Sequence, residues 1–444
     1  MANKLCKLLL LLICLLCAQQ IPTVYLWSNH DISSLELLQV VHRHGDRNPE
    51  NWFPNDPYLN LTKYWPEGDG QLSKDGKYRM YRLGQTLRRE YGSYLGSGFS
   101  PREVYARSSA KQRCLESVSL LLAGAYPPNN TLWQWNRSST ESQLGSVWQP
   151  IPIDTFIPMD EDRVLRLRAN CPAADADQAR VLSSDPAVQA FQRERQFLDQ
   201  LSQFVGTEFK TLNNINDFYD TLSIEFSHNY LWSTHHRWSP EFEKNVLTRL
   251  RPFVDLYWDL RFNSTLLQRI RGGPLVDELV KNIRNYQQNR ESRKIFVYST
   301  HDTLVDVLMQ TLDVYNHLLV PFGSALLIEL HRNLSTGANT QHFVRLYYYN
   351  ETLDDNSSPY LLHLPECDAR TDCPLDRFYD LTRQLIPEDW QHECGIHITD
   401  DSSSMSYANI TLLVLNAVML MALIVVLIYL FCCSRRRPHY QLLS

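Results

Sequence analysis

Three short segments of the sequence combine histidine, arginine and aspartate in patterns that suit phosphate chemistry. Residues 42–49 read His-Arg-His-Gly-Asp-Arg-Asn-Pro, and residues 300–303 read Thr-His-Asp-Thr. Residues 105–113 place arginines and a lysine around two serines. Guanidinium groups bind a phosphate dianion through paired hydrogen bonds, and a nearby carboxyl group can protonate a leaving oxygen. We therefore predict that the three segments meet at a phosphate-binding site.

The same residue types support hydrolysis of a phosphate ester without a metal ion or another cofactor. A histidine nitrogen can attack phosphorus directly, which divides the reaction into transfer to histidine and then transfer to water. Arginines stabilise the negative charge on the phosphoryl oxygens. The sequence has no His-Glu-x-x-His, Gly-x-Ser-x-Gly or P-loop motif, and His235 and His236 have no carboxylates or cysteines nearby at ligand spacing. Zinc, serine-hydrolase and P-loop chemistry are therefore disfavoured.

Each segment follows a stretch that is typical of a strand and precedes a helical pattern. Leu35–Val41 and Ile295–Ser299 are short, largely apolar runs. Apolar residues recur at helical spacing in 115–125 and in 302–312. The order strand, loop, helix predicts an α/β fold with a mainly parallel sheet flanked by helices. In such sheets ligands bind beyond the carboxyl ends of the strands, where the three segments stand.

We expect the α/β domain to consist of two parts, 19–150 and 272–395, on either side of a smaller inserted helical domain at 151–271. The inserted range is rich in Gln, Arg, Asn and Trp, and it shows helical patterns such as Phe191–Phe204 but no clear strand. This change of composition is the basis for the predicted boundaries.

Both ends of the chain predict export and membrane attachment. Residues 1–18 combine two lysines, an apolar run and a final small residue, as in a signal peptide. Residues 410–433 are almost wholly apolar and, as a helix, would cross the roughly 30 Å hydrocarbon layer; three arginines follow them. A buried core helix is the alternative. The positive-inside rule makes 434–444 a cytosolic tail and 396–409 a lumenal linker, giving a single-pass type I membrane protein.

The overall charge argues against one large class of partner. The chain of 444 residues has 43 Lys and Arg against 49 Asp and Glu, a net charge of −6, with no long basic run in its body. A nucleic-acid-binding protein would need a basic surface. Nucleic acid is therefore not an expected partner.

Sequons and cysteines agree with an exported body. Glycosylation is expected at Asn60, Asn129, Asn136, Asn263, Asn333, Asn350 and Asn356, whereas Asn409 adjoins the span and is expected to stay unmodified. The cysteines of the body are Cys114, Cys171, Cys367, Cys373 and Cys394. Because their number is odd, at least one thiol stays free or pairs between chains.

The motifs resemble those of the histidine acid phosphatases, the branch of the histidine phosphatase superfamily that includes the lysosomal and prostatic acid phosphatases. The similar segments are the signature at 41–49, its continuation at 65–76, the third arginine motif at 104–113, and the His-Asp region at 298–303 and 312–316. The resemblance covers about Leu35 to Cys394. It implies an α/β domain with a smaller helical insertion, and a homodimer as a common assembly of the family.

The resemblance also implies a role for each candidate side chain. His44 would accept the phosphoryl group, and Asp302 would donate the proton. The phosphate ligands would be Arg43, Arg47, Arg107 and His301.

Departures from the family pattern concern cysteines and one residue of the arginine motif. Two family cysteines are missing, near Glu225 and at Ala325. The remaining ones are implied to pair as Cys171–Cys394 and Cys367–Cys373, with Cys114 a free buried thiol. Ala110 stands where the family commonly has an acidic residue, which bears on rate and selectivity more than on reaction type.

We therefore expect an acid phosphatase that hydrolyses phosphate monoesters through a phosphohistidine. Acidic operation follows because Asp302 must carry a proton to act as an acid. In the tail, Tyr440 and Leu443 resemble a Tyr-x-x-hydrophobic signal that sorting adaptors bind, which predicts a lysosomal or endosomal membrane, with the plasma membrane as the variant.

Two other functions compete with this one. A catalytically weak or inactive ectodomain could keep the fold as a binding or adhesion module, and Ala110 is its only support. Other members of the superfamily suggest a phosphomutase or an inositol-phosphate phosphatase. The signal peptide argues against a cytosolic mutase.

Overall fold

The computed structural model describes residues 30–136, 143–235, 238–333, 341–351, 353, 358–367, 370–396 and 402–434. The expected signal peptide at 1–18, the sequon Asn356 and the tail residues Tyr440 and Leu443 lie outside the described residues, so these expectations stay predictions. The chain divides into one compact unit that ends at Cys394 and a second unit that begins at Gly395.

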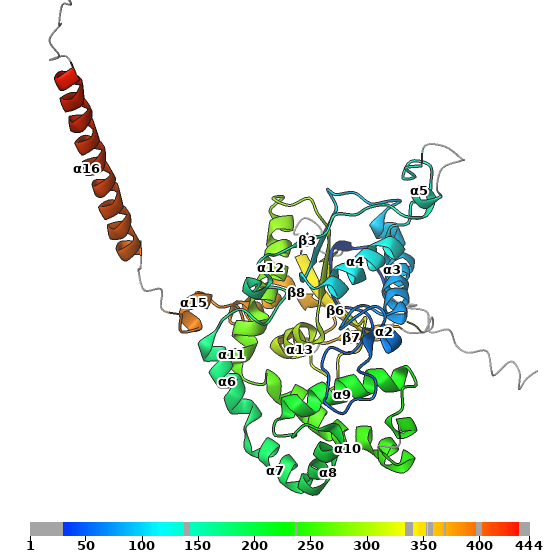
Figure 1. Cartoon of the computed structure of the whole chain (residues 1–444). Coiled ribbons are helices and arrows are strands. Elements are labelled where there is room, and N and C mark those ends of the chain that lie inside the picture. Colours follow the sequence, from blue (N-terminus) through cyan, green and yellow to red (C-terminus); the bar gives the residue numbers. More distant parts are fainter. Residues whose placement is uncertain are drawn as a thin grey trace, which may run out of the picture. The chain divides into compact units, whose positions relative to one another are not determined.

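The body is built around a single mixed sheet, whose place among the helices is visible in Figure 1. The described strands are β1 (Leu35–Arg43), β2 (Val104–Ser108), β3 (Asp154–Thr155), β4 (Ile295–Thr300), β5 (Ala325–Asn333), β6 (Gln341–Tyr349), β7 (Tyr360–Leu362) and β8 (Cys373–Pro374). Their order is β3-β2-β4-β1-β5-β6-β7, and β8 also pairs with β6.

The two halves of the sheet differ in strand direction. β1 and β2 both pair with β4 in parallel, and β3 pairs with β2 in parallel. From β5 onward every pairing is antiparallel, including that of β5 with β1. The prediction of a mainly parallel sheet is thus correct for the strands that precede the three motifs but wrong for the sheet as a whole. β5 and β6 pair as antiparallel neighbours. Antiparallel neighbours do not need the crossover helix that parallel strands need, so the strand-loop-helix pattern could not reveal them.

Helices cover both faces of the sheet and form a separate group beside it. The described helices of the body are α2 (Leu61–Tyr64), α3 (Lys74–Leu95), α4 (Gln112–Ala125), α5 (Leu144–Val147), α6 (Pro172–Leu182), α7 (Asp185–Arg193), α8 (Arg195–Val205), α9 (Leu212–Ser227), α10 (Pro240–Arg261), α11 (Thr265–Leu267), α12 (Gly273–Gln287), α13 (Asp302–Thr311), α14 (Leu375–Arg383) and α15 (Trp390–Glu393).

The main core lies between the sheet and helices α3 and α4. Leu38 and Val40 of β1 are buried in this core. Gln39 points to the opposite face, because side chains alternate along a strand, and it donates a hydrogen bond to the carbonyl of Leu279 in α12 at 3.0 Å. α12 and α13 both contact β1. The sheet is therefore the middle layer of three.

A second core lies within helices α7 to α10, which Figure 1 shows grouped beside the sheet. Phe218 of α9 and Leu250 of α10 are fully buried there. Phe53 and Tyr58, from the segment after β1, belong to the same core, so the chain that follows the first motif is held by the helical group. The boundaries 151 and 271 stay predictions; Asp154–Thr155, inside that range, pairs with β2 of the sheet.

Both expected disulfides are present. Cys171, which precedes α6, is bonded to Cys394, with Cα atoms 4.7 Å apart. Cys367 and Cys373 form a local bond. Cys114 is a free and buried thiol, as the resemblance implied.

The second unit contains helix α16 (Ser402–Ser434). Its stretch Asn409–Cys432 has a mean hydropathy of 2.9 and is long enough to cross a membrane. This agrees with the predicted span 410–433 and makes the helix a candidate membrane anchor.

The predicted glycosylation sites differ in exposure. Asn60, Asn129 and Asn263 are exposed, and Asn136, Asn333 and Asn350 are partly exposed. Exposure permits modification, which stays a prediction.

Two buried carboxyl groups face each other where the segment after β1 packs on α9. Asp56 is 5% exposed and Glu225 is fully buried. One oxygen of each is bonded within the protein: the amide of Tyr58 donates to Asp56 and the indole of Trp232 to Glu225, both at 2.7 Å. The remaining oxygens, Oδ2 of Asp56 and Oε1 of Glu225, are buried without a hydrogen-bond partner among the described residues, so we expect the pair to hold a shared proton that satisfies both. Burial and then the charge of Asp56 raise the pKa of Glu225 to about 9.

This pair predicts that the fold loses stability as pH rises. Folded Glu225 keeps its proton while unfolded Glu225 releases one above pH 4.5, so the free energy of unfolding should fall between pH 4.5 and about 9. Glu225→Gln keeps both hydrogen bonds without titrating. Its free energy of unfolding relative to wild type should therefore be about 4 kcal/mol greater at pH 8 than at pH 5, at about 1.36 kcal/mol per pH unit. Denaturant unfolding of the full chain in detergent, followed by tryptophan fluorescence, measures this. Equal pH slopes for wild type and Glu225→Gln would contradict the shared proton, and exposed Glu241→Gln is the control.

Candidate active site

The parallel half of the sheet brings the three motifs to one edge. β1 ends at Arg43 and β4 at Thr300, and the amide of His44 donates to the carbonyl of Thr300 at 3.0 Å. The amide of Ser109, after β2, donates to the carbonyl of Ser299 at 2.9 Å. A cavity of about 1030 Å³ opens at this edge. Of the residues predicted for the site, Arg43, His44, Arg47, His301 and Asp302 line it.

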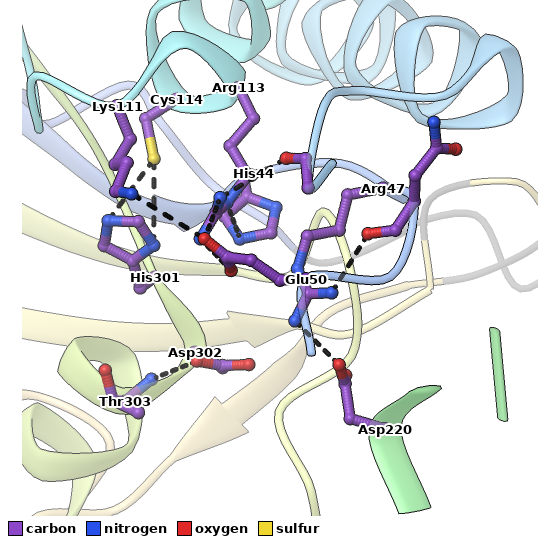
Figure 2. Close-up of polar contacts among 12 residues, drawn as sticks. His44, Arg47, Glu50, Lys111, Arg113, Cys114, Asp220, His301, Asp302 and Thr303 are labelled. Atoms are coloured by element: carbon purple, nitrogen blue, oxygen red, sulfur yellow. Dashed lines mark hydrogen bonds and ion pairs between the residues drawn. The ribbon is translucent and has the colours of Figure 1, made fainter. Parts of the chain in front are cut away.

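Hydrogen bonds hold the ring of His44 in one tautomer. Its Nδ1 lies 2.8 Å from the carbonyl oxygen of Gly45, which can only accept, so Nδ1 carries the proton. Its Nε2 accepts a hydrogen bond from Nε of Arg113 at 3.0 Å, as Figure 2 shows. Burial, and then the charges of Arg113 and Arg43, lower the pKa of His44 well below its ordinary value. The ring is therefore neutral, with a lone pair on Nε2.

Glycine is required beside His44 because two backbone segments meet there. A Cβ atom on Gly45 would lie 2.5 Å from the carbonyl oxygen of Gly76, in the first turn of α3. A Cβ atom on Gly76 would in turn lie 2.1 Å from the carbonyl oxygen of Asp46. The amide of Gly45 donates to Oγ of Ser117 in α4 at 3.1 Å. The loop that carries His44 is thus fixed against both helices.

Arg43 joins the site to the loop before β5. Its Nη2 lies 2.7 Å from a carboxylate oxygen of Asp302, and its Nη1 donates to the carbonyl of Val320 at 2.6 Å. The guanidinium carbon is 3.8 Å from the ring centre of Phe322. Burial alone would raise the pKa of Asp302, but the charges of Arg43 and Arg47 outweigh it and hold that pKa below its ordinary value.

The guanidinium groups retain unused donors. Arg47 donates to Asp220 of α9 at 2.9 Å, so the helical group contributes to the site. The Nε atoms of Arg43 and Arg47 are buried and have no hydrogen-bond partner among the described residues. Buried donors of this kind normally pair with a ligand or with water. Both side chains can therefore accept an anion in the cavity.

Arg113 was not among the predicted ligands, although it lies in the motif that contains Arg107. It is in the first turn of α4, contacts His44, and forms a pair of hydrogen bonds with Glu50 at 3.1 and 2.9 Å (Figure 2). The signal that could have found it is its position directly at the start of a helix that follows a strand.

Arg107 is a correction to the predicted set, because it does not line the cavity. It belongs to β2, whose neighbouring residue Ala106 points into the main core, so the pleat turns Arg107 to the other face. There it forms an ion pair with Asp162 at 2.8 Å. Ala110, the departure from the family pattern, does not line the cavity either.

His301 lies next to His44. The ring centres are 5.5 Å apart, and the rings meet edge to face. Nε2 of His301 is 3.1 Å from Oγ of Ser109 and 3.7 Å from the thiol of Cys114. Burial, and then the charge of Arg113, lower the pKa of His301 well below its ordinary value, while Asp302 opposes this. The site thus combines two neutral imidazoles with several guanidinium groups, and the carboxyl group of Asp302 lies beside Arg43.

Comparisons with known proteins agree with this geometry. The family model described as histidine phosphatase superfamily (branch 2) matches residues 34–349. Prostatic acid phosphatase of Rattus norvegicus is 36% identical over 365 residues, covering 81% of this chain and 89% of that protein. Lysosomal acid phosphatase of Homo sapiens is 32% identical over 409 residues, covering 92% and 90%.

A solved phytase from Citrobacter braakii shares the fold. Its TM-score is 0.58 at 17% sequence identity, over 81% of this chain and 99% of that one. The two acid phosphatases and the family match together identify the activity class. This chain is a phosphatase that belongs to branch 2 of the histidine phosphatase superfamily.

Proposed function

We propose that the protein hydrolyses phosphate monoesters at acid pH through a phosphohistidine on His44. The observation that carries this proposal is the tautomer of His44: a neutral ring whose Nε2 lone pair lies in a cavity lined by Arg43, Arg47 and Arg113. A nucleophile must be unprotonated, and positive groups around it attract the phosphate and stabilise the charge of the transition state.

In the first step, Nε2 of His44 attacks phosphorus and the bond to the ester oxygen breaks. Asp302 gives its proton to that oxygen, and an alcohol leaves. In the second step, water attacks the phosphoryl group on His44, and Asp302 takes a proton from this water. Inorganic phosphate leaves, and both side chains return to their initial states.

The environment of Asp302 explains why acid pH is favourable. Without substrate, Arg43 is paired with Asp302 and stabilises its charged form. A phosphate bound to Arg43 and Arg47 compensates these charges, which raises the pKa of Asp302 toward the range in which it carries a proton. Low pH increases that protonated fraction further.

The mechanism predicts different effects for the two central residues. His44→Ala should reduce phosphate release from p-nitrophenyl phosphate by about 10³-fold or more, because no phosphoryl acceptor remains. Asp302→Asn should reduce hydrolysis of an alkyl phosphate by about 10²-fold or more but that of the aryl phosphate much less, because only the alkoxide needs a proton to leave. Rates of the full chain in detergent across pH measure both effects.

A matched control is His392→Ala, which removes an exposed histidine outside the cavity. Quenching a reaction with substrate in alkaline denaturant, which preserves the acid-labile phosphohistidine, should leave phosphate on wild type but none on His44→Ala. A folded wild type without any phosphatase activity would contradict the enzymatic mechanism and favour the binding-module hypothesis.

Separate substitutions of Arg113 and Arg107 distinguish the roles of these two arginines. Arg113→Gln should lower kcat/KM by about 10²-fold, because a donor at the phosphate is lost. Arg107→Gln should mainly lower the melting temperature, because Asp162 is 1% exposed and loses its charged partner. Kinetics and thermal unfolding of both variants measure this. A large loss of kcat/KM in Arg107→Gln but not in Arg113→Gln would show that Arg107 is the phosphate ligand.

We also propose attachment to the lysosomal membrane, with the body in the lumen. The lysosomal acid phosphatase relatives and the apolar helix α16 support this. If sorting adaptors bind the tail signal, Tyr440→Ala should move the protein to the cell surface, whereas Gln441→Ala should not. Microscopy in cultured cells measures the location, and unchanged lysosomal delivery of Tyr440→Ala would discredit the signal.

A further inference from the structure

One buried cation of the cavity has no part in the proposed reaction. Arg166 lines the same cavity as His44, although its side chain is only 4% exposed. Its Nη1 is buried without a hydrogen-bond partner among the described residues. Its Nη2 is 3.8 Å from Asp160, which is 67% exposed, so this pair contributes little. A buried donor without a partner, on a side chain that lines a cavity, normally pairs with a ligand or with water.

The loop that carries Arg166 is held firmly at the edge of the sheet. The hydroxyl of Thr300, at the end of β4, donates to the carbonyl of Leu165 at 3.0 Å. The amides of Val164 and Leu165 donate to Asp162 at 3.0 and 3.1 Å, and Asp162 is in turn paired with Arg107. Arg107 thus acts as a positioning residue for this loop. The guanidinium group of Arg166 is therefore placed in advance of any ligand.

The positive charge of the cavity that contains Arg166 exceeds the negative charge that one phosphate group supplies. Among the described residues, nine Lys and Arg side chains and five carboxylates line the cavity. Burial, and then the charge of Arg168, lower the pKa of Arg166, and Arg113 acts in the same direction. Arg168 also lines the cavity and is exposed at its rim. Crowded cations of this kind are unfavourable until an anion joins them.

We propose that Arg166, assisted by Arg168, binds a second phosphoryl group of the substrate beside the one that His44 attacks. A guanidinium group matches a phosphoryl group through two parallel hydrogen bonds. The preferred substrates are then small bisphosphates rather than simple monophosphates. This inference rests on the proposed function, because the first phosphoryl group is the one transferred to His44.

The test compares propane-1,3-diol bisphosphate with 3-hydroxypropyl phosphate, in both of which the leaving group is a primary alcohol of the same three-carbon chain. Two equivalent phosphates alone double kcat/KM, so the expected preference of the full chain for the bisphosphate is about tenfold or more. Arg166→Gln should reduce that preference to about twofold and leave hydrolysis of the monophosphate within about twofold of wild type. Arg166→Lys should restore part of it.

The matched control is Arg163→Gln, which removes an arginine of the same loop that lies over the ring of Trp390 and does not line the cavity. It should keep the full preference. A wild-type preference of about twofold, or one that survives Arg166→Gln, would overturn the subsite.

A binding measurement separates this proposal from the catalytic one. Titration calorimetry of His44→Ala with the two compounds should show tighter binding of the bisphosphate, and the combination of His44→Ala with Arg166→Gln should abolish the difference. If the wild type hydrolyses neither compound, the proposed function fails, but this comparison still supports or refutes the subsite. A melting temperature of Arg166→Gln close to wild type excludes a general loss of structure.

Discussion

The structure of this site depends on the burial of a neutral histidine among guanidinium groups. The hydrogen bond from Nδ1 of His44 to the carbonyl of Gly45 leaves the lone pair on the other nitrogen, and the surrounding arginines keep the ring unprotonated. The same arginines have buried donors that the protein does not satisfy. A phosphate ester satisfies both conditions at once, since it supplies acceptors for the donors and an electrophile for the lone pair.

The mixed sheet provides the frame for this arrangement. Parallel strands β1, β2 and β4 end at one edge, so residues that are far apart in sequence meet there. The antiparallel strand β5 closes the site from the other side, because the loop before it brings Val320 and Phe322 to Arg43. The helical group adds Asp220 beside Arg47. The loop before β5 thus fixes the guanidinium group of Arg43, and the helical group fixes that of Arg47.

Two sets of carboxyl groups make the protein sensitive to pH in different ways: Asp302 in the site, and the pair of Glu225 and Asp56. Asp302 is held charged by Arg43 until substrate charge compensates it, so its role depends on what is bound. Glu225 and Asp56 share a proton in the helical core, so their role depends on pH alone. The first concerns the reaction and the second the stability of the fold. Both are consistent with work in an acidic compartment, which the lysosomal acid phosphatase relatives suggest independently.

The sequence alone was sufficient for the motifs around His44 and Asp302 and for the candidate membrane helix, because each is a local pattern with a specific chemistry. The disulfide Cys171–Cys394 joins residues 223 positions apart, and it was expected only from the resemblance to the family. Tertiary structure decided what depends on direction in space. The pleat of β2 turns Arg107 away and leaves Arg113, at the start of α4, beside His44. The antiparallel pairing of β5, the contact of Asp56 with Glu225 and the burial of Arg166 join segments that are distant in the chain. No local periodicity encodes such contacts, since they arise only when separate elements pack together.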